Sequence, residues 1–153
     1  MARDDDPGTP EAMARKIAIV GPHGDPVLAE YPLGCLLARQ IISQDMHNAG
    51  MRYSELAGKV LGRTKPKRAG VGRFSELSDH AEQVVERRWR EGCEVLINAG
   101  GRACKYEVDD VVVYERWPTW LVNSGQIPPV RQLKRAGGLL ITGLTALSDW
   151  IAG

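Results

Sequence analysis

The sequence lacks several patterns that mark common classes of protein. No apolar run approaches the roughly 20 residues that a membrane-spanning helix requires. Residues 1–12, MARDDDPGTPEA, are acidic and rich in proline and glycine, the opposite of a basic and then apolar signal peptide. The net charge of +1 gives no overall field that would demand nucleic acid or a membrane surface as a partner. We therefore expect no membrane partner.

Cysteine and histidine are also few. The three cysteines form no CxxC pair and leave an odd thiol, which favours a reducing cytoplasm over a disulfide framework. The three histidines stand far apart, without the spacing of metal ligands. We therefore predict a cytoplasmic protein with no metal site and no cofactor.

The length and composition predict one folded domain. A chain of 153 residues with 43% apolar and 25% charged residues has the composition of an ordinary globular protein and is long enough to bury one core. We assign residues 1–13 to a flexible acidic tail and residues 14–153 to a single domain. Within it, residues 59–74 read as a basic, mobile loop, because glycine and proline interrupt the apolar pattern there.

Four short apolar runs are predicted to be strands. They are KIAIVG (16–21), CEVLIN (93–98), VDDVVVY (108–114) and GLLIT (138–142). Apolar residues recur at helical spacing between them, which predicts helices near 31–48, 53–61, 75–92, 128–137 and 144–152. Gly50 and Gly92 are read as helix ends. The alternation predicts a Rossmann-like, three-layer α/β domain with a mostly parallel sheet of four or five strands.

A parallel sheet would bring the loops after its strands to one edge, where ligands of such sheets bind. The loop after the first strand is neither a P-loop nor a GxGxxG fingerprint. Two tryptophans after the third strand either stack on a base or cover the edge of the core. The predicted ligand-binding residues are Gly21, Pro22, Gly24, Asp25, Trp117, Trp120, Ser124 and Gly125.

Two residues at this edge are candidates for catalysis. A histidine with a near-neutral pKa could transfer a proton, and His23 is the histidine of a predicted edge loop; it could equally be a solvated loop residue. Glu115 is the carboxylate between the third strand and the next helix, where burial beside the tryptophans would raise its pKa.

The stretches KIAIVGP and DDVVVYERWPTWLVNSGQIPPVRQLKRAGGLLIT resemble the nucleoside deoxyribosyltransferase superfamily, which includes nucleotide N-glycosidases. The resemblance covers under a third of the chain. It implies an α/β fold, a nucleotide or nucleoside as ligand, and cleavage or transfer at the N-glycosidic bond. The family's nucleophilic glutamate is expected just after Ser124-Gly125 and is missing here. Glu115 or Glu107 would have to replace it, or the domain binds nucleotides without cleaving them.

The basic stretch 59–73 supports an alternative function. It contains six basic residues and no acidic one. The side chains of Lys65, Lys67, Arg68 and Arg73 could neutralise phosphates in a non-catalytic nucleic-acid-binding or interaction module. The same stretch could be a solvated connection. The sequence leaves the oligomeric state open, a homo-oligomer included.

Overall fold

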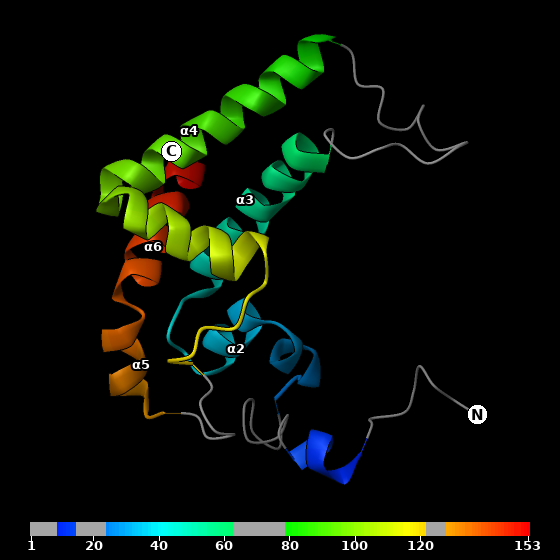
Figure 1. The fold of residues 1–153 in the computed structure, drawn as a ribbon, viewed down its shortest axis with the longest axis vertical. Helices are drawn as coiled ribbons and strands as arrows, with labels where there is room; N and C mark the ends of the chain where they lie inside the picture. Colours follow the sequence, from blue (N-terminus) through cyan, green and yellow to red (C-terminus); the bar gives the residue numbers. More distant parts are fainter. Residues whose placement is uncertain (1–8, 15–23, 63–78, 122–127) are drawn as a thin grey trace, which may run out of the picture.

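The computed structural model describes residues 9–14, 24–62, 79–121 and 128–153, and in these residues it contains helices and no strand (Figure 1). The predicted Rossmann-like α/β fold with a parallel sheet is therefore wrong. Residues 93–98 lie inside helix α4 (Asp79–Val108), and residues 138–142 begin helix α6 (Gly138–Ala152). Residues 108–114 include the π-helix η3 (Asp109–Val113). The first predicted strand, 16–21, lies outside the described residues.

The strand prediction fails because an apolar run indicates burial and does not indicate which element is buried. A short apolar run fits a strand covered on both faces, but it fits the buried side of a helix equally well, and periodicity alone does not separate the two. Each of the three described runs buries only some of its residues, and in 108–114 the buried ones are Val108, Val111 and Val112, at helical spacing. Leu96 is fully buried in the first run, and Leu140 in the last. These runs therefore supply the core from helices.

The N-terminal part of the molecule consists of short helical elements followed by one long helix. Residues 10–14 form a helical turn, and the hydroxyl of Thr9 accepts a hydrogen bond from the backbone N–H of Ala12 at 3.1 Å. The 3₁₀ helix η1 (Pro26–Glu30) leads into helix α2 (Pro32–Ala38), which begins with proline, a residue well suited to the first helical turn. Helix α3 (Gln44–Gly62) follows and is the first long helix of the described chain.

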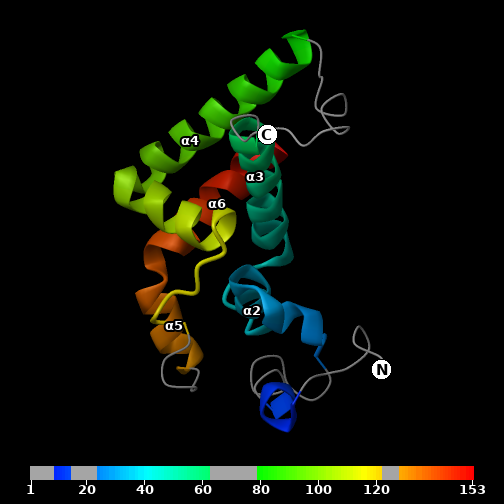
Figure 2. The same cartoon turned by 45° about the vertical axis from the view of Figure 1, so that its right-hand side comes forward.

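Helix α4 folds back on itself. Gly101 has φ 79° and ψ −175°, a conformation open almost only to glycine, and it divides α4 into a first arm (79–100) and a second arm (102–108). Figures 1 and 2 both show the two arms meeting at a sharp angle. The change of direction lies in the glycine-containing stretch NAGGR (98–102), which connects the two helical arms.

Helix α6 lies at the centre of the packing. It contacts both α4 and α3, and its N-terminal end follows helix α5 (Val130–Ala136) (Figure 2). Leu140, Leu144 and Leu147 are fully buried along one side of it. They join one hydrophobic core with residues from α2, α3, α4 and η3. None of the described helices is both long and apolar enough to cross a membrane.

Three glycines allow these helices to pack closely. A Cβ added at Gly143 of α6 would lie 2.6 Å from Cγ2 of Val108 in the second arm of α4. At Gly50 of α3 it would lie 2.7 Å from Cδ2 of Leu33, and at Gly92 it would lie 3.3 Å from the ring of Trp150. Gly50 and Gly92 therefore stand inside helices at contact points, and their assignment as helix ends is wrong.

Candidate functional site

The structure describes one of the two predicted catalytic residues. Glu115 is exposed at the surface just after η3, with a left-handed φ of 51°. The burial beside tryptophans that would suit a nucleophile is not found at this side chain. His23 lies outside the described residues. The catalytic assignment of both residues stays a prediction, and the sheet edge that it presupposes does not exist in the described chain.

The predicted ligand-binding residues have local structural contacts where the structure describes them. Gly24 directly precedes Asp25, whose Oδ1 accepts a hydrogen bond from the backbone N–H of Val27 at 3.0 Å and caps η1. The indole N–H of Trp120 donates to Oε1 of Glu107 in the second arm of α4 at 3.2 Å. Asp25 is therefore a helix cap, and Trp120 covers the edge of the core, one of its two predicted roles.

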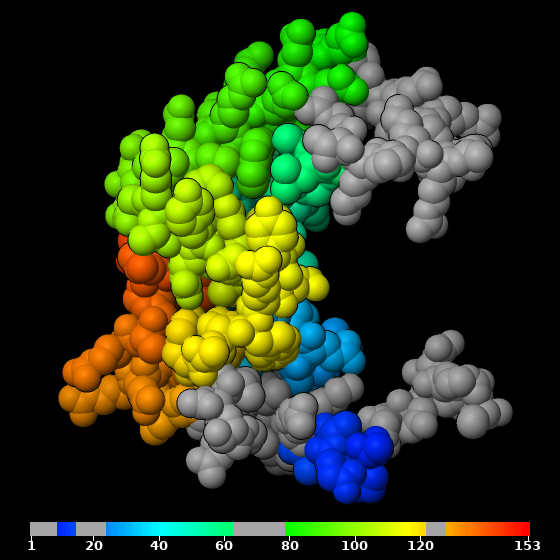
Figure 3. Space-filling model, in the orientation of Figure 1, coloured from blue at the N-terminus to red at the C-terminus, as the bar shows by residue number. Residues whose placement is uncertain are grey.

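The remaining predicted residues divide into exposed and undescribed ones. The side chain of Trp117 is 40% exposed. Those of Tyr106 and Tyr114 are also exposed, at 61% and 55%. Figure 3 shows the end of α4 and the segment that follows it on the viewed face. Gly21, Pro22, Ser124, Gly125, Lys65, Lys67, Arg68 and Arg73 lie outside the described residues.

A cavity of about 220 Å³ opens between α3, the first arm of α4 and the C-terminal end of α6. We call it the α3–α4–α6 pocket. Its lining residues come from all three helices and combine charged with apolar and aromatic side chains: Arg52, Glu55, Leu56, Lys59, Arg88, Trp150 and Ile151. The spacing of the α3 residues explains their position, because side chains three, four and seven residues apart lie on the same side of a helix.

Positive charge predominates in this pocket. Three cationic side chains face one carboxylate, that of Glu55. The guanidinium of Arg88 lies 4.2 Å from the ring centroid of Trp150, a cation–π contact, and also forms an ion pair with Glu91 at 3.3 Å. Among the described residues, Arg52 and Lys59 form no ion pair. An anion in the pocket could therefore bind Arg52 and Lys59. The guanidinium of Arg88 lies beside them against the Trp150 ring.

Sequence reasoning finds only one residue of this pocket, Lys59, as the first residue of the basic stretch. The sequence does carry a signal for Arg52. Arg52 and Lys59 stand seven residues apart, so a helix that begins before residue 52 places both on one side. The predicted helix begins at Tyr53 and excludes Arg52. Trp150 lies in the predicted C-terminal helix, but only the fold brings it to α3.

A different side of α3 carries a buried polar cluster. The hydroxyl of Tyr53 donates to Oδ1 of Asp109 at 2.7 Å, and Nζ of Lys105 contacts Oδ2 of the same carboxylate at 2.5 Å. The ring of Trp89 lies 4.8 Å from that of Tyr53, and Sγ of Cys93 is 3.9 Å from the Tyr53 hydroxyl. We call these five residues the Tyr53 cluster. It ties α3 to both arms of α4 and to the first residue of η3.

The electrostatics of the Tyr53 cluster keep its amine, thiol and phenol protonated. Burial lowers the pKa of Lys105, but the hydrogen bond and charge of Asp109 offset this, and the net shift is upward. Burial raises the pKa of the Cys93 thiol. Burial and the hydrogen bond to Asp109 raise the pKa of Tyr53 far above its usual range. A protonated amine, thiol and phenol are poor bases and nucleophiles at neutral pH, so the cluster is structural.

A second buried contact joins η1 and α2 to α3. The hydroxyl of Tyr31 lies 2.8 Å from Nε2 of His47, which is buried, and Nδ1 of His47 lies 3.3 Å from Oδ1 of Asn48. Both ring nitrogens of His47 thus face polar atoms within the protein. The described residues contain no group of three or more metal-ligating side chains.

Comparisons with protein-family models, with curated proteins and with solved structures gave no match to this chain.

Proposed function

We propose that this chain is a non-catalytic helical module that binds nucleic acid through a cationic surface at the C-terminal end of α3. The observation that carries the proposal is the accumulation of positive charge in the α3–α4–α6 pocket, where Arg52 and Lys59 form no ion pair among the described residues. Lysine and arginine bind phosphates without reading bases, so this surface favours affinity over sequence specificity.

The sequence beyond α3 adds to this charge. Lys59 is both a lining residue of the pocket and the first residue of the basic stretch 59–73. That stretch carries six basic residues and no acidic one in a chain whose net charge is only +1. Positive charge is thus concentrated in one part of the sequence and balanced elsewhere. A local cationic surface of this kind binds polyanions even when the whole protein is nearly neutral.

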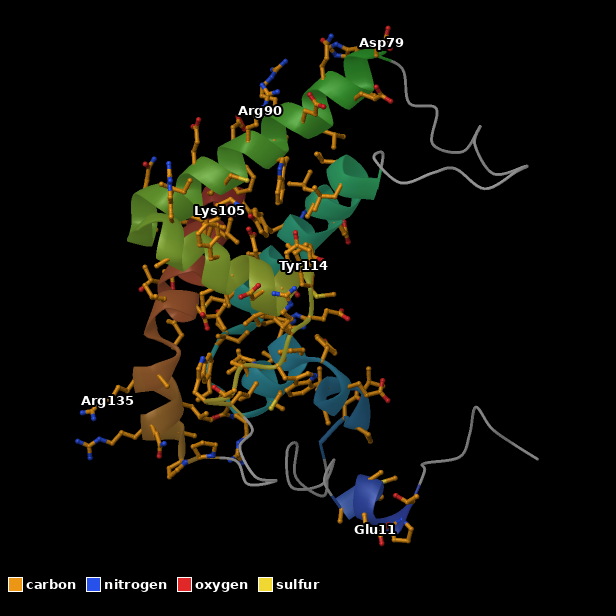
Figure 4. The ribbon with its side chains drawn as sticks, viewed as in Figure 1. Glu11, Asp79, Arg90, Lys105, Tyr114 and Arg135 are labelled. Atoms are coloured by element: carbon orange, nitrogen blue, oxygen red, sulfur yellow. The ribbon has the colours of Figure 1, made fainter. Side chains whose placement is uncertain are left out.

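Two variants of equal charge test the proposal. The Arg52→Gln/Lys59→Gln variant removes two positive charges from the pocket, and the control variant Lys134→Gln/Arg135→Gln removes two from α5. Both α5 side chains are exposed, and Figure 4 shows Arg135 projecting away from the rest of the molecule. Fluorescence anisotropy with labelled single-stranded and duplex DNA and RNA, at two salt concentrations, gives the affinity and its salt dependence.

We expect salt-sensitive binding by the unmodified chain. For every phosphate that the pocket variant no longer neutralises, the slope of log K against log salt should become shallower by about 0.9 for a duplex and about 0.7 for a single strand. The α5 variant should keep the slope. An equal weakening in the two variants would mean that only net charge matters, and the proposal would then be wrong. A further variant, with Lys65, Lys67, Arg68 and Arg73 changed to glutamine, measures the share of the basic stretch.

A further inference from the structure

We propose that the α3–α4–α6 pocket receives one unpaired nucleotide of a single-stranded nucleic acid, with its base against Arg88 and Trp150 and its phosphate on Arg52 and Lys59. This inference rests on the proposed nucleic-acid binding and specifies that the bound nucleic acid is single-stranded and not a duplex. Charge alone does not assign it, because cationic side chains bind the phosphates of duplexes and single strands alike.

The size of the pocket limits its occupant. Pockets for drug-sized ligands measure about 300–1,000 Å³, whereas this one measures about 220 Å³. It therefore has room for a single base, with the adjoining phosphate on Arg52 and Lys59, and not for a base pair. The base pairs of a duplex are stacked on their neighbours and do not enter a small pocket, while the unstacked bases of a single strand can turn out and do so.

The chemistry of the pocket wall suits a base. The guanidinium of Arg88 lies 4.2 Å from the ring centroid of Trp150, so its plane is held against an aromatic surface. Bases stack on guanidinium planes and on aromatic side chains, and both groups stand together here. Leu56 and Ile151 also line the pocket. A base can stack on the guanidinium and aromatic groups here, a contact that a bare phosphate does not make with an aromatic ring.

Both members of the stacking pair have contacts within the protein before any ligand binds. The Trp150 ring lies against the position where a Cβ of Gly92 would stand, at 3.3 Å, and it packs on the hydrophobic core. Arg88 also pairs with Glu91 at 3.3 Å, and both side chains are partly exposed. A preorganised pair loses little conformational entropy on binding. Arg52 and Lys59 then stand at the same pocket to neutralise the adjoining phosphate.

The test compares three probes with the full chain: a single-stranded oligonucleotide of about 12 nucleotides, the same strand with abasic sites throughout, and the corresponding duplex. The abasic strand keeps every phosphate and lacks every base. We expect the base-containing strand to bind at least about fivefold more tightly than the abasic strand, because stacking of a single base contributes about that much or more.

The Arg88→Lys variant separates stacking from charge. Lysine keeps the positive charge and lacks the planar guanidinium. Its affinity for the base-containing strand should fall to that for the abasic strand, while its affinity for the abasic strand stays the same. The Arg52→Gln/Lys59→Gln variant should weaken both. Arg88 is exposed, so the variant should fold, and thermal melting checks this.

The outcomes distinguish this inference from the proposed function. If no probe binds, the proposed function fails and this inference fails with it. If abasic and base-containing strands bind equally, or the duplex binds more tightly, nucleic-acid binding stands and the single-nucleotide pocket is wrong. A titration with a nucleoside monophosphate covers a free nucleotide: if the monophosphate binds as tightly as the strand, and the Arg88→Lys change weakens it, the occupant is a small molecule and the inference is overturned.

Discussion

Helix α3 presents two contrasting sides. On one side Tyr53 is fully buried, and its hydroxyl binds Asp109, which also neutralises Lys105. On the other side Arg52 and Lys59 line an open pocket and form no ion pair among the described residues. The polar groups of the first side are satisfied within the protein, so they contribute to stability and leave little for a ligand. The charges of the second side contribute little to folding and remain available for binding.

The largest effect is expected from breaking the Tyr53 cluster. An Asp109→Asn substitution leaves the Lys105 ammonium without its counter-charge, and the side chains of the pair are only 13% and 20% exposed. Removing one partner of a buried ion pair costs about 3–5 kcal/mol, and because this pair is partly hydrated we expect about 2–3 kcal/mol in the free energy of unfolding. Urea denaturation measures the decrease.

A matched substitution checks the cause. Glu94 is exposed on the first arm of α4, so Glu94→Gln removes the same charge and should change the free energy of unfolding by no more than about 0.5 kcal/mol. The Asp109→Asn protein should keep its affinity for nucleic acid, because neither Asp109 nor Lys105 lines the pocket. A stability equal to that of the unmodified protein would show that the Lys105–Asp109 pair contributes nothing.

Alkaline pH should weaken the buried side as well. Burial raises the pKa of the Cys35 thiol from 9.0 to about 11, and burial also raises the pKa of Tyr53 and of Cys93. Each group holds its proton more tightly when folded than when unfolded. The contribution of each group to the free energy of unfolding is complete below its pKa in the unfolded chain. It is lost as the pH rises toward its pKa in the folded protein.

The free energy of unfolding should therefore fall by about 2 kcal/mol or more between pH 8 and pH 10.5, since one group contributes about 1.4 kcal/mol per pH unit in this range. Urea denaturation at several pH values measures the curve. A Tyr53→Phe variant lacks one of these ionisable groups, so its decline above pH 10 should be shallower. A flat curve would contradict the burial of these groups.

Two glycines of α3 differ in how closely other side chains pack against them. A Cβ at Gly50 would lie 2.7 Å from Leu33 and 3.1 Å from Leu144, whereas a Cβ at Gly58 would meet nothing within 4 Å. We expect Gly50→Ala to cost about 1–3 kcal/mol through overpacking, and Gly58→Ala to stabilise the helix by about 0.5–1 kcal/mol. Thermal and urea unfolding compare the two variants, and a stabilising Gly50→Ala would disprove the tight packing.

The same glycines show why the sequence predicts the helices better than their ends. Helices near 31–48, 53–61, 75–92, 128–137 and 144–152 all overlap helices of the structure where it describes them. Sequence reasoning places helix ends at Gly50 and Gly92, because glycine is common after the last turn of a helix. In the fold they lie where another helix approaches closely. A single sequence does not say which neighbour a glycine will face, so the two roles look alike.

The strand assignments fail for a related reason. CEVLIN is short, apolar and partly β-branched, and such a run fits a buried strand or a buried helical segment. The preceding 14 residues from Asp79 to Gly92 are already helical, and the run continues their spacing once Gly92 is read as an internal residue. Leu96 then falls on the buried side of α4. One misread glycine thus turns a helix into a strand and supports a parallel sheet.

The candidate site is even less visible in the sequence. In the helix predicted near 53–61, the apolar residues Leu56, Val60 and Leu61 share one side, which favours burial of that side. In the fold Tyr53 and Ala57 are buried there, and Leu56 lines the pocket. The pocket also needs Arg88 and Trp150, which are far apart in sequence from α3 and from each other. Such a site depends on helix packing, and local patterns do not encode it.

The smallest change in stability is expected where the change in binding is greatest. Arg52 and Lys59 are exposed, so the Arg52→Gln/Lys59→Gln variant should unfold within about 0.5 kcal/mol of the unmodified protein. Its affinity for nucleic acid should nevertheless fall, and fall most at low salt, where neutralising a phosphate contributes most to affinity. Urea denaturation and anisotropy on the same preparation measure both quantities. A large decrease in stability would mean that these charges belong to the folded core in the way that Asp109 does, and the contrast between the two sides of α3 would no longer hold.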